Sequence, residues 1–207
     1  MEHLPIKIKG HVLIKDKDTG EILLDQDNAV HPRNAAIALA RLLAAENNGA
    51  VYVLALGNGG SNVTATDVVE YNDPFDNDYT ETARLYNTTY WEVVDDSTSA
   101  PDGNSVSFNN TMDGDNAIVT VTLELSAGEP TGQDVSDSGD FNNVYAFDEL
   151  GLFTDAQPTP WPTWVDPQPA IPEKALMLTH IVFSPILKTT NRAIIITYTL
   201  TIALDAS

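Results

Sequence analysis

The pattern of apolar and polar positions along this 207-residue chain is mostly that of β-strands. The clearest case lies within 117–125, where apolar residues alternate with threonine and glutamate from Ile118 to Leu125 as in a strand with one solvated face. Apolar, β-branched or aromatic runs at 50–56, 82–94, 105–108, 144–153, 175–183 and 193–204 predict further strands. About eight short strands separated by turn-rich segments predict a mainly β fold, an antiparallel, jelly-roll-like β-sandwich.

The N-terminal region 11–49 combines a predicted β-hairpin with the one predicted α-helix. Two apolar runs, 11–15 and 21–24, flank a turn at 16–20 whose Asp, Thr and Gly suit side-chain caps and a positive φ. Alanine and leucine fill the helix predicted over 34–46, Pro32 lies near its start and Gly49 follows it. Apolar residues at helical spacing form a face expected to pack against a sheet: Ile37, Leu39, Ala40, Leu43 and Ala44.

These elements are expected to form a single β-rich domain spanning 1–207 with long surface loops. After the hairpin and helix, 11–49, come an acidic, loop-rich middle at 57–143 and a proline- and tryptophan-containing loop at 157–172. The C-terminal strands at 175–204 complete the domain.

The charge of the chain is strongly negative and most of it is local. Ten Lys and Arg stand against 30 Asp and Glu, a net charge of −20. Between Thr66 and Asp155 there are twenty acidic residues and one base, Arg84. Such a surface repels phosphate, so direct nucleic-acid binding is not expected. Solvated loops that keep the protein soluble are one reading of the acidic residues, and a face for basic partners or cations is another.

Few residues of the chain stand in patterns typical of catalytic, cofactor-binding or metal-binding sites. It has no cysteine, which fits a reducing compartment, and no apolar run long enough for a membrane span or a signal peptide. Gly57-Asn-Gly-Gly60 lacks the Lys-Ser/Thr of a phosphate loop and is expected to be a tight turn. The turn beginning at Asp16 lacks calcium-loop spacing, and no two histidines stand at metal-ligand spacing; His180 is expected to be a hydrogen-bonded core residue. No catalytic residue, cofactor or metal is predicted.

Trp161 and Trp164 are the strongest interaction feature of the sequence. They stand in the stiff proline-rich loop, and tryptophan is enriched where protein surfaces meet. Two interpretations stay open: the rings fold back and seal the end of the sandwich, or they anchor a partner.

Several strings, taken in order, resemble a broad group of small virion proteins of tailed bacteriophages, among them tail, baseplate, neck and fibre-attachment components. They include Ala55-Leu-Gly-Asn-Gly-Gly60, Phe147-Asp-Glu-Leu-Gly-Leu-Phe153, Phe183-Ser-Pro-Ile-Leu-Lys188 and a final apolar strand. The resemblance implies a repeated, symmetric subunit made in the host bacterial cytoplasm and placed in the virion. Its expected partners are copies of itself and other virion proteins, without nucleic acid or membrane, and no catalytic residues carry over.

Lys188 and Arg192 place positive charge, which is rare in this chain, in the C-terminal region. Two interpretations are open: these bases contact an acidic patch on a neighbouring subunit, or they stand in a surface-exposed turn. A non-enzymatic subunit of the neck or collar, or of the tail and baseplate, is therefore the expected function. The alternatives are a capsid decoration protein, a carbohydrate-binding β-sandwich with Trp91, Trp161 and Trp164 as its sugar platform, and, least favoured, a hydrolase with an acidic pair.

Overall fold

The computed structural model describes residues 6–77, 80–94, 103–110, 116–130, 144–157 and 170–204. In these ranges the chain forms eleven β-strands, one α-helix and one 3-10 helix. In chain order they are β1 (Ile6–Asp16), β2 (Ile22–Val30), α1 (Pro32–Leu43), β3 (Val51–Gly57), β4 (Ser61–Val63), β5 (Val69–Tyr71), η1 (Pro74–Asn77), β6 (Thr88–Val93), β7 (Ser105–Asn110), β8 (Asn116–Leu125), β9 (Val144–Thr154), β10 (Met177–Thr189) and β11 (Ile194–Leu204).

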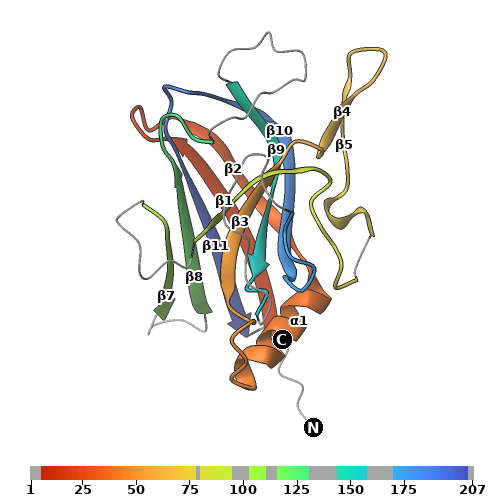
Figure 1. Ribbon diagram of the computed structural model, residues 1–207, viewed down its shortest axis with the longest axis vertical. Helices are drawn as coiled ribbons and strands as arrows, with labels where there is room; N and C mark the ends of the chain where they lie inside the picture. The colour runs from red at the N-terminus through yellow and green to blue at the C-terminus, as the bar shows by residue number, and fades with distance from the viewer. Residues whose placement is uncertain are drawn as a thin grey trace.

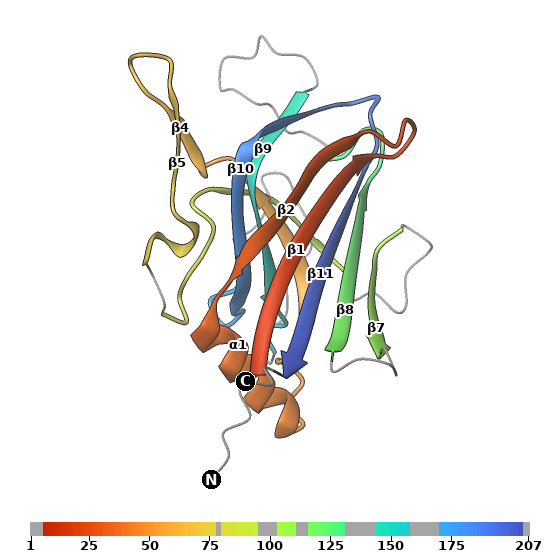
Figure 2. The same ribbon diagram turned by 180° about the vertical axis from the view of Figure 1, so that it is seen from behind.

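Nine of these strands form one antiparallel sheet in the order β6-β3-β9-β10-β2-β1-β11-β8-β7. The sheet curls strongly, with β3, β9 and β10 in one half and β1, β11 and β8 in the other (Figures 1 and 2). Strand β2 joins the halves, because residues 22–28 pair with β1 while Ala29 and Val30 pair with β10. The predicted mainly β class with one helix is confirmed, whereas the finer prediction of a jelly-roll-like sandwich is not.

The larger of two core clusters connects both halves of the curled sheet. Ile14, Leu123 and Tyr198 come from one half, and Leu54 and Phe147 from the other. The second cluster lies on the opposite face of β3, where Val53 and Ala55 alternate with Leu54 and Leu56 of the larger cluster. Strand β3 is thus buried on both faces, which explains why its sequence is an unbroken apolar run.

Helix α1 lies across one end of the curled sheet (Figure 1). It begins after His31, whose ring Nδ1 accepts a hydrogen bond from the backbone N–H of Asn34 at 3.1 Å. The buried residues of the helix are Asn34 and Ala38, and the Asn34 amide donates to the carbonyl oxygen of Met177 at 2.9 Å. The predicted apolar face was wrong, because the helix meets the end of the sheet and leaves Leu39 and Leu43 exposed.

The β1–β2 hairpin forms as predicted, with the turn held by Asp16. Its Oδ1 accepts hydrogen bonds from the backbone N–H groups of Asp18 at 3.0 Å and Thr19 at 2.8 Å, and Gly20 adopts a φ of 73°. The other carboxylate oxygen lies 2.6 Å from Nε of Arg192. The Thr19 N–H and the Arg192 guanidinium together lower the pKa of Asp16 from 3.8 to about 2.

This depressed pKa predicts an acid-sensitive turn. Asp16 stabilises the fold fully above its ordinary pKa of 3.8, and the contribution is lost as the pH falls towards about 2. We expect the Asp16→Asn variant to show a smaller loss of stability over that window than the parent chain, measured by urea denaturation at a series of pH values. Asp18→Asn, at the exposed neighbouring position, is the matched control. Parallel pH profiles for the parent and Asp16→Asn would contradict the prediction.

Candidate functional site

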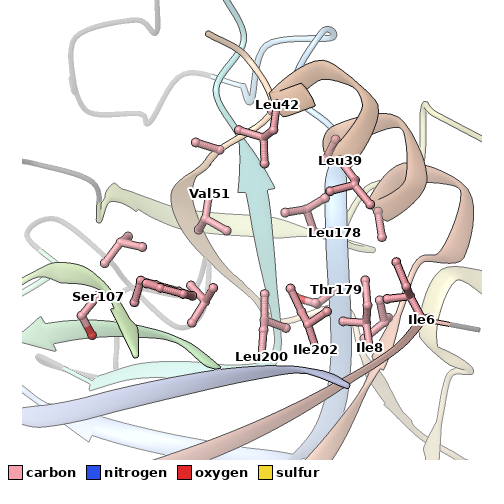
Figure 3. Close-up of a pocket in the computed structure, with 18 residues that line it drawn as sticks. Ile6, Ile8, Leu39, Leu42, Val51, Ser107, Leu178, Thr179, Leu200 and Ile202 are labelled. Atoms are coloured by element: carbon pink, nitrogen blue, oxygen red, sulfur yellow. The ribbon is translucent and has the colours of Figure 1, made fainter. Parts of the chain in front are cut away.

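An apolar pocket opens beneath α1, at the end of the curled sheet (Figure 3). Its volume is about 430 Å³. Side chains from α1 face those from β11 across the cavity, with Leu39 and Leu42 on one side and Leu200 and Ile202 on the other. The complete lining is Ile6, Ile8, Val30, Ala35, Ala38, Leu39, Leu42, Gly49, Ala50, Val51, Val106, Ser107, Phe108, Val119, Leu178, Thr179, Leu200 and Ile202.

The chemistry of the pocket suits an apolar occupant. Only Ser107 and Thr179 contribute hydroxyl groups to the lining. The Ser107 hydroxyl donates to the Thr120 carbonyl oxygen at 3.4 Å, and the Thr179 hydroxyl accepts from the Leu152 N–H at 3.1 Å. Both hydroxyl groups are therefore hydrogen-bonded within the chain, and the pocket can bind an apolar group by burying its surface.

Large apolar side chains that remain exposed surround the mouth of the pocket. Ile6 is 54% exposed, Leu39 41%, Leu42 51% and Phe108 69%. They come from β1, α1 and β7, so the folded sheet gathers them from distant parts of the sequence. A contiguous exposed patch of this kind marks an interaction site more often than isolated apolar residues do.

A second apolar surface lies on the β4–β5 arm, residues 61–71, which projects from the far end of the molecule (Figures 1 and 2). Val63 pairs with Val69 and Ser61 with Tyr71, so these side chains share one face of the arm. Val63, Val69 and Tyr71 are all exposed, while Asn62 and Glu70 occupy the other face. The arm thus presents an apolar face that its own chain does not cover.

The tip of the β4–β5 arm is held by its own hydrogen bonds. The backbone N–H of Thr64 donates to the Val68 carbonyl oxygen at 2.9 Å, and the N–H of Asp67 donates to the Thr64 carbonyl oxygen at 3.0 Å. The Thr64 hydroxyl accepts from the Val68 N–H at 3.2 Å. A tip fixed in this way loses little conformational entropy on binding.

The root of the arm is fixed to the sheet by Asp148 of β9. Its carboxylate accepts hydrogen bonds from the backbone N–H groups of Gly60 at 2.9 Å and Ser61 at 2.8 Å, and from the Ser61 hydroxyl at 2.5 Å. Asn72 closes the root from the other strand, since its N–H donates to the Gly60 carbonyl oxygen at 2.8 Å. The arm therefore leaves the body of the protein in a defined direction.

Glu149, the next residue of β9, is fully buried with His180. His180 Nδ1 accepts from the Phe75 N–H at 3.0 Å, so Nε2 carries the proton and donates to Glu149 Oε2 at 2.9 Å. The backbone N–H groups of Tyr86 and Asn87 also donate to this carboxylate, at 3.0 and 2.9 Å. Although burial opposes ionisation, these hydrogen bonds hold the pKa of Glu149 below its ordinary value.

This network confirms one prediction from the sequence, that His180 is a hydrogen-bonded core residue. The tight turn predicted at Gly57–Gly60 is not confirmed, because Gly57 ends β3 and residues 58–60 form a bent link to β4. The end of β3 requires glycine because a Cβ on Gly57 would lie 2.4 Å from Glu149 Oε1 and 2.5 Å from the Asn87 carbonyl oxygen. Asp148 holds the root of the β4–β5 arm and Glu149 holds the segment before β6, so the role of both carboxylates is positional.

Lys188 and Arg192 both have partners within the chain. Lys188 is 1% exposed, and its ammonium donates to the backbone carbonyl oxygens of Ser126, at 2.8 Å, and Glu129. Burial lowers its pKa, and the Glu129 carboxylate partly offsets that effect. Arg192 binds Asp16 and, at 3.2 Å, Glu21. The structure therefore places Lys188 inside the chain rather than in an exposed turn, while contact with a neighbouring subunit stays a prediction.

Of the three tryptophans considered for a sugar platform, the structure describes Trp91 alone. Trp91 is 4% exposed and belongs to the second core cluster, so its ring is not available to a ligand. Trp161 and Trp164 lie outside the described residues, as do parts of the acidic middle, so both interpretations of the tryptophan loop stay open.

The sequence alone indicated neither the apolar pocket nor the β4–β5 arm. Among the residues that the structure describes, no group of three or more His, Asp or Glu side chains is placed to hold a metal ion, and no helix is long and apolar enough to cross a membrane. No family model, curated protein or solved structure matches the chain.

Proposed function

We propose that this protein is a non-enzymatic structural subunit that assembles through protein–protein contacts. The observation that carries the proposal is the β4–β5 arm, whose apolar face of Val63, Val69 and Tyr71 is exposed on an anchored root. A two-stranded hairpin is marginally stable by itself, and an uncovered apolar face on it is best explained by a partner that covers it.

The virion of a tailed bacteriophage is the assembly we propose, at the neck or collar or at the tail and baseplate. Support comes from the resemblance of the sequence strings, three of which fall in β9, β10 and β11, interior strands of the large sheet. The acidic surface argues for protein partners over nucleic acid. We also infer that the two halves of the sheet pack against each other as the two layers of a β-sandwich do, because the larger core cluster contains residues from both halves.

We expect the purified chain to form a homo-oligomer or to bind purified tail or neck particles, as measured by light scattering and co-sedimentation. Substituting the arm face, Val69→Ser with Tyr71→Ser, should abolish particle binding while leaving the circular dichroism spectrum unchanged. Leu187→Ser is the matched control, because Leu187 is 55% exposed but lies outside the arm and the pocket. A strict monomer at high concentration that binds no particle would contradict the proposal, as would reproducible turnover in a broad substrate panel.

A further inference from the structure

We infer that the β4–β5 arm of one copy docks by its tip into the apolar pocket of a second copy, joining the subunits head to tail. The inference rests on the proposed function and deepens it by naming the partner and both contact surfaces. It requires that the arm cannot reach its own pocket, that the two surfaces match chemically, and that the match is specific to this pair.

The positions of the two surfaces meet the first requirement. The arm projects from one end of the molecule and α1, above the pocket, lies at the other, as both views show (Figures 1 and 2). The root of the arm is anchored through Gly60 and Ser61 to Asp148, so the arm is not free to fold back. Contact between arm and pocket must therefore join two chains.

The chemistry of the two surfaces meets the second requirement. The arm tip exposes Val63, Val68 and Val69, which are 69%, 54% and 41% exposed. The pocket offers an apolar cavity of about 430 Å³ whose two hydroxyl groups are already hydrogen-bonded within the chain. Inserting small branched side chains there would remove apolar surface from water on both partners without leaving polar atoms unpaired.

Charge makes the match specific. The segment 61–73 carries Asp67, Glu70 and Asp73 and no Lys or Arg. The end of the molecule that holds the pocket carries bases in a chain that has only ten. Lys7 and Lys9 stand in β1 beside the pocket residues Ile6 and Ile8, on the opposite face of the strand, and both lysines are exposed. An acidic arm approaching this end meets positive charge, whereas most of the remaining surface would repel it.

Docking of this type is heterologous, because the two contact surfaces differ. A heterologous contact closes into a ring when the rotation between copies permits and otherwise extends into a filament. It also makes a prediction that an isologous apolar contact does not: each copy has one donor surface and one acceptor surface that can be inactivated separately.

The experiment uses two variants of the full chain. Val63→Ser with Val69→Ser inactivates the arm, and Leu39→Ser with Leu42→Ser inactivates the pocket mouth. All four side chains are exposed, so folding should be retained. Each variant alone should associate with itself at least about tenfold more weakly than the parent in sedimentation velocity. Leu43→Ser, on the same helix but outside the pocket lining and 81% exposed, should associate as the parent does.

Mixing the two variants gives the decisive result. One intact arm and one intact pocket remain in the mixture, so a one-to-one dimer should form and nothing larger. Failure of the mixture to form this dimer would overturn the inference, as would self-association of the parent that neither variant weakens. A bound single-chain lipid in native mass spectra, retained when the parent self-associates, would overturn it too, because the pocket would then be a ligand site.

Failure of the inference and failure of the proposed function are distinguishable. If the parent binds particles or self-associates independently of arm and pocket, the docking inference is wrong and the structural role stands. If the parent neither self-associates nor binds particles, both are wrong. Raising the salt concentration should weaken the parent contact modestly, since its electrostatic part is screened while its apolar part is not.

Discussion

The Glu149→Ala variant is expected to lower the free energy of unfolding by about 3–5 kcal/mol, because it breaks a buried, hydrogen-bonded network. Four groups donate hydrogen bonds to Glu149, namely the backbone N–H groups of Gly59, Tyr86 and Asn87 and Nε2 of His180. Removing the carboxylate takes the acceptor from the fully buried His180 ring and from three partly buried N–H groups, and each unsatisfied buried group costs about 1–3 kcal/mol.

Glu149→Gln separates the charge of this group from its shape. Glutamine keeps one acceptor oxygen but turns an N–H₂ group towards backbone N–H donors, so we expect an intermediate loss of about 1–3 kcal/mol. Glu70→Ala, at an exposed carboxylate on the arm, should change stability by less than about 0.5 kcal/mol. Chemical denaturation measures all three. Equal stabilities for Glu149→Ala and Glu70→Ala would show that the buried network contributes nothing.

This network also shows why the sequence predicted some strands correctly and misjudged another. The strand predicted over 82–94 begins only at Thr88, because the N–H groups of Tyr86 and Asn87 bind the Glu149 side chain instead of a neighbouring strand. Alternation of apolar and polar residues is local and predicted β8 well. The hydrogen bond from the Asn87 N–H to the Glu149 carboxylate joins residues 62 positions apart, so no local sequence pattern predicts it.

Strand β10 illustrates the same limit. The sequence predicted its end at Phe183, two residues before Pro185, and proline is in general unfavourable inside a strand. The strand continues to Thr189, and Pro185 falls where the ladder to β9 is interrupted between Val182 and Ile186. An irregularity in the ladder tolerates the missing N–H of proline, and its position depends on the partner strand.

The candidate site was the least predictable part of the molecule. The pocket draws its lining from α1 and from strands as far apart in the chain as β1 and β11, and it exists only because the sheet curls. The helix was predicted, but its orientation was not, because Leu39 and Leu43 have the spacing of a buried face. Only the end-on placement of α1 leaves leucines at the mouth of a cavity, and that placement follows from the whole sheet.

Phe147→Ala is expected to lower the free energy of unfolding by about 3–5 kcal/mol and to do so in a single transition. The ring is fully buried, stacks with Tyr145 at 5.5 Å between centroids, and meets Phe183 edge-on at 5.8 Å. The cavity left by alanine lies in the larger core cluster, which connects both halves of the curled sheet. Because both halves share this core, probes in each half should report the same melting temperature.

Phe108→Ala is the matched substitution for this test, since it removes the same ring at a position that is 69% exposed. Its stability should stay within about 0.5 kcal/mol of the parent. Because Phe108 stands at the mouth of the pocket, the same variant should weaken self-association, so the two phenylalanines separate folding from docking. Two resolved transitions for Phe147→Ala would show that the halves fold independently, and equal losses of stability at both positions would contradict the placement of Phe147 in the shared core.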